Sequence, residues 1–197
     1  MIIFDLDGTL ADCEHRRHFV DPVKALKNGF IPAVEHFEGF VLDKDRGNVY
    51  HKETNEKWKP DWKSFYEACD KDLVFSPVKS VLIQFCHRDI QIWSGRCESV
   101  RKKTEVWLDK NIFDGDFEKF TRIKLKMRPI GDTTPYHILK EMWFNERCSD
   151  LIEAKMECRA PIKHDIEFVF EKDPESINMW KRRGVFVFNC NQNGIEF

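Results

Sequence analysis

Residues 1–9 read MIIFDLDGT, and this stretch decides the fold class of the chain. Four apolar residues run directly into Asp5, and Leu6, Asp7 and a glycine turn follow. A short apolar run that ends in turn residues is typical of a buried strand. The chain is therefore predicted to begin with a strand whose exit carries two carboxylates.

Further apolar runs of strand length occur along the chain. They lie at Asp89–Trp93, Ile123–Met127, Ile166–Phe170 and Val185–Phe188. Segments with helical spacing follow these runs. The alternation predicts an α/β fold, a Rossmann-like three-layer sandwich around a mostly parallel sheet.

Two of the predicted helices are marked by the residues at their starts. Thr134 is a suitable N-cap and Pro135 a suitable first helical residue, and the helix that they start carries Lys140 in its second turn. Pro174 starts another helix, which Gly184 ends.

Two segments interrupt this rhythm. Residues 23–74 contain two alternating runs around Asp45–Asn48, which indicate a hairpin, and then an amphipathic stretch. We interpret residues 23–74 as a cap inserted into a single domain that spans residues 1–197. The segment Cys148–Lys163 is predicted to be an irregular surface excursion.

The composition argues against several classes of protein. A net charge of −2 is not in itself typical of nucleic-acid binding. No apolar run reaches the roughly 18 residues of a membrane span. The seven cysteines form no C-x-x-C pair, which disfavours a zinc ribbon or disulfide framework and favours reduced thiols in a cytoplasm. No G-x-x-x-x-G-K-[ST] motif is present, so no P-loop kinase activity is expected.

Polar residues gather at the predicted strand ends and on one helix that can reach them. They are Asp5, Asp7, Ser94, Arg96, Lys140, Glu171 and Asp173. In open α/β sheets, ligands bind outside the carboxyl ends of the strands. Clustered carboxylates repel one another, and their oxygens suit Mg²⁺, while lysine and arginine suit a phosphate oxygen. The pattern predicts phosphoryl chemistry in which one aspartate attacks phosphorus and the other transfers a proton.

Residues 4–11, FDLDGTLA, resemble the first motif (DxDGT) of the haloacid dehalogenase superfamily phosphatases. A strand ending in Ser94, then Lys140, then an acidic cluster follow in that superfamily's order. The chain is most similar to the phosphatase domain of phage-type polynucleotide kinase-phosphatases. In those proteins the second motif reads SGR, as at residues 94–96, and a segment like MRPIGDTTPYHILKEMWF (residues 127–144) also occurs.

The resemblance implies a role for each matching residue. Asp5 would be the nucleophile and Asp7 the general acid and base, while Ser94 and Lys140 would hold the transferring phosphoryl group. The implied substrate contacts are Arg96, Arg128 and Thr9. The implied ligands of Mg²⁺ are Asp5, Asp7, Asp173 and Glu171. The family often has two adjacent aspartates where this chain reads Glu171-Lys172-Asp173-Pro174, and we expect Asp173 to be the main ligand.

The resemblance implies a Mg²⁺-dependent phosphomonoesterase that removes 3′-phosphates from nucleic-acid ends, in the cytoplasm, or the host cytoplasm if the protein is phage-encoded. The cap leaves two alternatives open. One is a 5′(3′)-nucleotidase that acts on free nucleoside monophosphates, and the other is a non-catalytic binding module of the same fold. The expected partner is a phosphorylated nucleic-acid end or a nucleotide, with no membrane and no identified protein partner. Trp58 and Trp62 in the cap are candidates for base stacking.

Overall fold

The computed structural model describes residues 1–21, 40–43, 48–51, 53–116, 118, 123–155 and 164–191. The chain divides into two compact units. The first comprises Met1–Asp12 and Leu73–Phe197, and the second comprises Cys13–Asp72. Of the described helices, none is long and apolar enough to cross a membrane.

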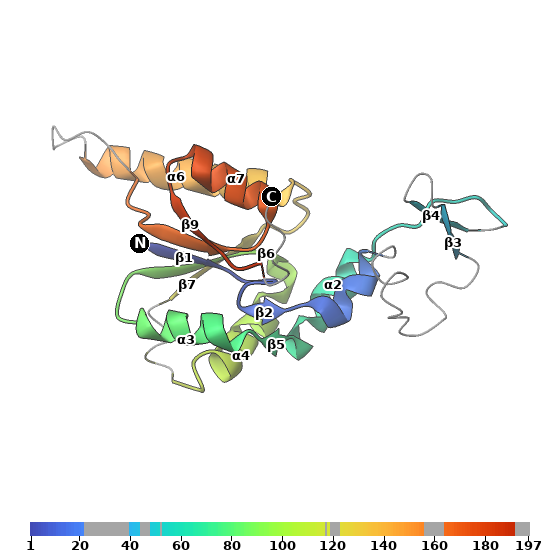
Figure 1. The fold of residues 1–197 in the computed structure, drawn as a ribbon, viewed down its shortest axis with the longest axis horizontal. Helices are drawn as coiled ribbons and strands as arrows, with labels where there is room; N and C mark the ends of the chain where they lie inside the picture. Colours follow the sequence, from blue (N-terminus) through green and yellow to red (C-terminus); the bar gives the residue numbers. More distant parts are fainter. Residues whose placement is uncertain are drawn as a thin grey trace. The chain divides into compact units, whose positions relative to one another are not determined.

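A parallel five-stranded sheet forms the centre of the first unit (Figure 1). Its strand order is β7-β6-β1-β8-β9, and all four neighbouring pairs are parallel. The strands are β1 Ile2–Asp5, β6 Ile90–Cys97, β7 Lys124–Arg128, β8 Phe168–Glu171 and β9 Phe186–Asn189. The predicted α/β fold with a mostly parallel sheet is therefore confirmed.

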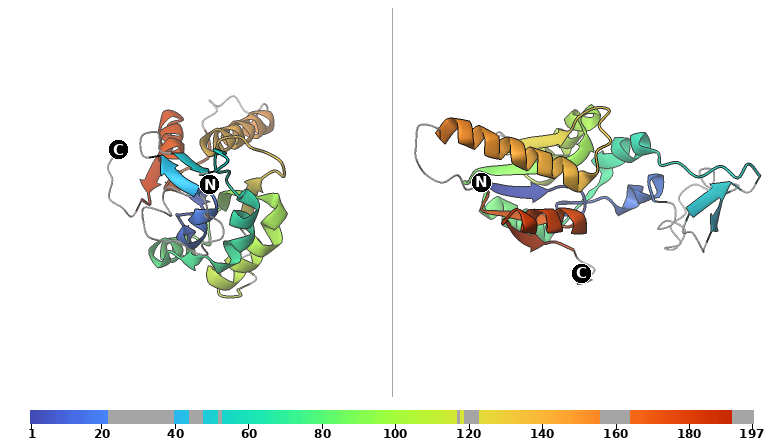
Figure 2. Two further views of the ribbon diagram at one scale, coloured as in Figure 1. Left: turned by 90° about the vertical axis from the view of Figure 1, so that its right-hand side faces the viewer. Right: turned by 90° about the horizontal axis from the view of Figure 1, so that it is seen from above.

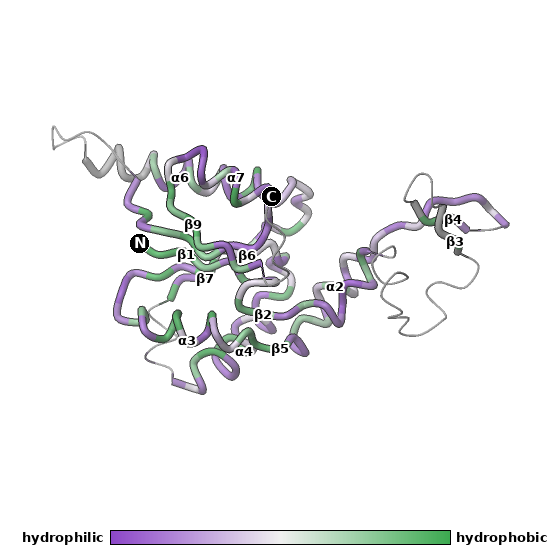
Figure 3. The backbone as a smooth tube through the Cα atoms, in the orientation of Figure 1, coloured by the Kyte–Doolittle hydropathy of each residue, from purple (hydrophilic) through white to green (hydrophobic). Residues whose placement is uncertain are grey.

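Helices cover both faces of this sheet and complete the three layers (Figure 1). They are α3 Ser76–Gln84, α4 Arg101–Asn111 after the short 3₁₀ turn η4 Glu98–Val100, α6 Tyr136–Lys155 and α7 Pro174–Arg182. In β1, Ile2 and Phe4 face the core that α3 and α4 cover, whereas Ile3 faces the core under α6 and α7. Because both faces of β1 are buried, it reads as a continuous apolar run. Figure 3 shows hydrophobic residues concentrated on these central strands.

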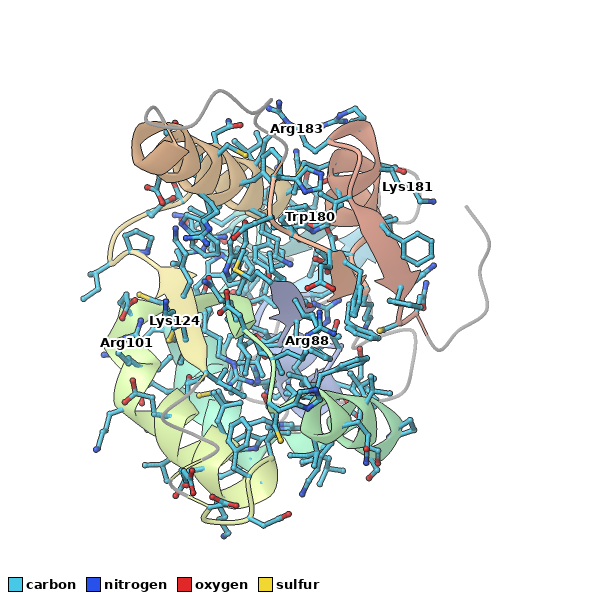
Figure 4. The ribbon with its side chains drawn as sticks, turned by 90° about the vertical axis from the view of Figure 1, so that its left-hand side faces the viewer. Arg88, Arg101, Lys124, Trp180, Lys181 and Arg183 are labelled. Carbon is cyan, nitrogen blue, oxygen red and sulfur yellow. The ribbon has the colours of Figure 1, made fainter. Side chains whose placement is uncertain are left out.

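The core under α6 and α7 is rich in aromatic side chains. The two helices lie side by side over the strands (Figure 2). Trp180 of α7 is fully buried, and its ring lies 5.6 Å from that of Trp93 on β6 and 6.0 Å from that of Phe144 on α6. Figure 4 shows Trp180 between the helices and the sheet. This side chain therefore joins three elements in one packed layer.

Several predicted boundaries differ from the structure. The strand expected at Asp89–Trp93 continues to Cys97, because Ser94 and Cys97 still pair with β7 across an irregularity in the register. The prediction of an irregular segment at Cys148–Lys163 is wrong for residues 148–155, because α6 continues to Lys155. Residues 156–163 lie outside the described part of the chain. The strand expected at Ile166–Phe170 is β8, and it ends on Glu171.

Two short strands lead into and out of the second unit. They are β2 Ala11–Asp12 and β5 Leu73–Val74, and they pair antiparallel, with Asp12 opposite Leu73. The described elements of the second unit are η1 Glu14–Phe19, β3 Phe40–Asp43, β4 Asn48–His51, α2 Trp62–Glu67 and η3 Ala68–Lys71. Strands β3 and β4 pair antiparallel as expected for the hairpin, while its turn at 44–47 and residues 22–39 lie outside the described part.

An ion pair joins the two ends of the second unit. The Arg16 guanidinium donates from Nε and Nη2 to the two carboxylate oxygens of Asp72, both at 2.7 Å, and lies 4.1 Å from the centre of the Phe65 ring. Arg16 and Asp72 are buried, so this arginine serves the packing of its unit. Of the two stacking candidates, Trp58 is also buried, whereas Trp62 is half exposed.

Trp180→Ala is expected to lower the free energy of unfolding by about 3–5 kcal/mol, because it leaves a cavity between three elements. Phe186→Ala on the exposed face of β9 is the matched control and should cost less than about 1 kcal/mol. Urea unfolding of the two variants measures both values. Equal losses would contradict this account of the core.

Candidate active site

The polar cluster lies where the strand order of the sheet reverses direction. The central strand β1 has β6 on one side and β8 on the other, and the chain crosses from one side to the other between β7 and β8. Ligand sites of open α/β sheets lie at such a switch point, outside the carboxyl ends of the strands. The register pairs Phe4 with Phe170, so the last residues of β1 and β8, Asp5 and Glu171, end level with each other.

Lys140 occupies the space between these two carboxylates. Its Nζ donates to Asp5 Oδ1 at 3.0 Å and also to Glu171 Oε2. All three side chains are almost completely buried. The helix α6 therefore contributes the cation that compensates two carboxylates at the ends of two strands, as buried charges require.

Burial and charge shift the pKa values of this group. Burial raises the pKa of Glu171 to about 7, with the negative charge of Asp5 adding to the effect and Lys140 opposing it. Burial lowers the pKa of Lys140, but the charges of Asp5 and Glu171 outweigh that effect and raise it above its usual value. Lys140 therefore stays a cation at neutral pH, whereas Glu171 takes up a proton near neutral pH.

Tyr136, which the sequence reasoning missed, also contacts Asp5. Its hydroxyl donates to Asp5 Oδ1 and lies 3.1 Å from the carbonyl oxygen of Trp93. Burial and then the charge of Asp5 raise the pKa of this phenol, so it remains a hydrogen-bond donor. Tyr136 precedes Lys140 by four residues on α6, and Lys140 Nζ lies 3.9 Å from the centre of its ring. The spacing of four residues from Lys140 on a helix is the sequence pattern that could have identified Tyr136.

A glycine provides the room for Tyr136. A Cβ atom on Gly95 would lie 2.9 Å from Cε2 of the Tyr136 ring and 3.0 Å from Cδ2. Real Cβ atoms almost never come this close to another side chain, so only glycine fits beneath the ring. The packing of Tyr136 therefore explains why the central residue of the SGR segment at 94–96 is glycine.

The loop after β1 holds the second aspartate. Gly8 has a φ of +86°, a conformation that L side chains rarely adopt, and it lets the loop fold back so that three amide groups donate to the carbonyl of Leu6. Thr9 Oγ1 donates to Asp5 Oδ2 at 3.0 Å. Arg96 donates from Nε and Nη2 to Asp7 Oδ1, at 2.8 and 2.6 Å.

The residues predicted from the SGR segment take positions inside the fold. Ser94 and Arg96 are fully buried, and the Ser94 hydroxyl oxygen accepts the backbone N–H of Arg96 at 3.2 Å. Arg128 donates to the backbone carbonyls of Gly95 at 3.1 Å, Thr134 at 2.6 Å and Asp132 at 3.5 Å, and it also pairs with the Asp132 carboxylate. Arg128 therefore ties the segment before α6 to β6.

The two acidic residues at the end of β8, Glu171 and Asp173, have different partners. Glu171 Oε1 accepts the backbone N–H groups of Lys172 and Asp173, at 2.9 and 3.0 Å. Asp173 Oδ2 accepts the N–H of Ser176 at 2.8 Å and caps α7. Both oxygens of Glu171 are therefore engaged, whereas Asp173 uses one oxygen as a cap.

Comparison with known proteins supports the fold at low sequence identity. No protein-family model and no curated protein matches the chain. Two structures of the Pnkp1/Rnl/Hen1 complex, one described as an RNA repair complex, contain chains similar to it, each with 21% identity and a TM-score of 0.54. The match covers 95% of this chain but only 41% and 44% of those chains. A haloacid dehalogenase-like family hydrolase from Streptococcus pneumoniae matches more weakly, with 12% identity, a TM-score of 0.47, and coverage of 95% of this chain and 82% of that one.

Gly95→Ala should destabilise the protein by about 1–3 kcal/mol, because the new methyl group overlaps the Tyr136 ring. On a Tyr136→Ala background the same change should cost almost nothing, since the ring is gone. Urea unfolding of the wild type, the two single variants and the double variant gives the four free energies of unfolding that this double-mutant cycle compares. Additive effects would mean that Gly95 and Tyr136 are not in contact.

Proposed function

We propose that this chain is a phosphomonoesterase that works through an aspartyl-phosphate. The observation that supports it best is Asp5, a buried carboxylate at the end of the central strand, held by Thr9 on one oxygen and by Lys140 and Tyr136 on the other. A carboxylate fixed at a switch point beside a cation is suited to attack a phosphorus atom.

In the first step, an oxygen of Asp5 forms a bond to phosphorus while the bond from phosphorus to the ester oxygen breaks. Asp7 gives a proton to the departing oxygen, which leaves as an alcohol. In the second step, Asp7 takes a proton from a water molecule that attacks the phosphorus, and the Asp5 carboxylate is released with inorganic phosphate. Lys140 stabilises the charge on Asp5 in both steps, and Arg96 fixes the orientation of Asp7.

The donor atoms suit Mg²⁺ in kind, since Asp5 and Asp173 offer carboxylate oxygens and Asp7 offers a backbone carbonyl oxygen. In the described part of the chain, no three Asp, Glu, His or Cys side chains lie close enough together to hold an ion as they stand. Asp5, Asp7 and Asp173 would hold it, with Glu171 already bonded through both oxygens. When bound, Mg²⁺ would neutralise charge on the phosphoryl oxygens.

The proposed substrate is a 3′-phosphate at a nucleic-acid end. Support comes from the SGR and GDT segments and from the fold shared with a chain of an RNA repair complex. The test is phosphate release from 3′-phosphorylated oligonucleotides, 5′-phosphorylated oligonucleotides and free nucleoside monophosphates. Preference for the monophosphates would favour the nucleotidase, and no release from any of them would favour a non-catalytic module.

Asp5→Asn should abolish turnover almost completely, because the amide keeps the shape of the side chain but loses its nucleophilicity. Asp7→Asn should lower kcat by about 10²–10⁴-fold through the loss of proton transfer. Steady-state kinetics measure both, and acid-quenched protein from the wild type should carry labelled phosphate that Asp5→Asn lacks. Turnover by Asp5→Asn near the wild-type rate would exclude this mechanism.

Removal of divalent ions with EDTA should abolish activity, and Mg²⁺ should restore it. Ca²⁺ should bind but support turnover poorly, because its coordination is larger and less rigid. Asp173→Ala should raise the Mg²⁺ concentration needed for half-maximal activity more than Glu171→Ala does. The opposite order would assign the main ligand to Glu171.

A further inference from the structure

Lys172 lies over the loop that follows the proposed nucleophile. Its Cδ is 2.6 Å, and its Nζ 2.8 Å, from the position that a Cβ atom on Gly8 would take. The ammonium group therefore sits against the backbone between Asp7 and Thr9. Lys172 is half-buried, whereas Asp5 is buried.

The acidic neighbours of Lys172 in the sequence do not neutralise it. The carboxylate of Glu171 faces Lys140, and that of Asp173 caps α7. Among the described residues, the Lys172 ammonium has no hydrogen bond or ion pair. An uncompensated cation held beside a catalytic loop is suited to bind an anion.

The other cations of the cluster already have partners. Lys140 bonds to Asp5 and Glu171, and Arg96 bonds to Asp7. Arg128, whose predicted substrate contact stays a prediction, bonds to backbone carbonyls and pairs with Asp132. Lys172 is therefore the cation of this cluster that can contact a substrate phosphate without first leaving a partner within the described residues.

We propose that Lys172 binds the phosphodiester next to the terminal phosphate, and so favours a polynucleotide end over a substrate with one phosphate. This assignment rests on the proposed function. The terminal phosphoryl group must reach the buried Asp5, so the next phosphate of the strand lies nearer the surface, and Lys172 is the half-buried cation that contacts the loop after Asp5. The lysine between the two acidic residues then has a role in choosing the substrate.

The test compares a 3′-phosphorylated oligonucleotide with p-nitrophenyl phosphate, which has no phosphodiester. Lys172→Gln should lower kcat/KM for the oligonucleotide by about tenfold, the size of one charged hydrogen bond, and leave p-nitrophenyl phosphate within about twofold. The slope of log affinity against log salt should become less steep by about 0.7, the value for one phosphate contact on a single strand. Lys172→Arg should keep most of the oligonucleotide activity.

Lys181→Gln is the matched control, since it removes the same charge from the exposed side of α7 (Figure 4). It should change neither kcat/KM for either substrate nor the salt dependence of oligonucleotide affinity. Equal losses of Lys172→Gln on both substrates, or an unchanged salt slope, would overturn the assignment. Hydrolysis of neither substrate by the wild type would refute the proposed function alone. Equilibrium binding of a fluorescent 3′-phosphorylated oligonucleotide to wild type and Lys172→Gln still measures the slope in that case.

Discussion

The site depends on one buried arrangement of charge, the ammonium of Lys140 between Asp5 and Glu171. Removing charges from water costs several kcal/mol for each ion, and only good pairing offsets that cost. The three residues come from α6, β1 and β8, so the three elements must be aligned for the charges to meet. One cation faces two carboxylates, and burial, with the charge of Asp5 adding to it, raises the pKa of Glu171.

Much of the fold could be predicted because its signals are local. The apolar run at Ile2–Asp5 and the proline starts near α6 and α7 indicate elements that the structure contains. The end of β6 could not be predicted, since Ser94 and Gly95 have the composition of a turn, and only pairing with β7 keeps them in a strand. The helix α3, Ser76–Gln84, lies just after the segment interpreted as an insertion, and the sequence analysis predicted no element there.

The site could be predicted in its residues more than in its contacts. The strand ends and the family resemblance indicated Asp5, Ser94 and Lys140, which the fold brings to one end of the sheet. The sequence reasoning assigned the cation that offsets the carboxylates to a metal, whereas Lys140 and Arg96 already provide much of that compensation. Such pairing depends on the distance between elements far apart in the chain.

The antiparallel pairing of β2 with β5 has a consequence for how this protein can diversify. The chain leaves the first unit at Asp12 and returns at Leu73, directly opposite in the register. Two adjacent strand ends can be joined by a tight turn or by a segment of almost any length, and each doubling of that length costs only about 0.6 kcal/mol in closure entropy. The inserted unit is therefore an exchangeable module. Recombination at this stem can exchange the segment between Asp12 and Leu73 while the order of the central sheet stays the same.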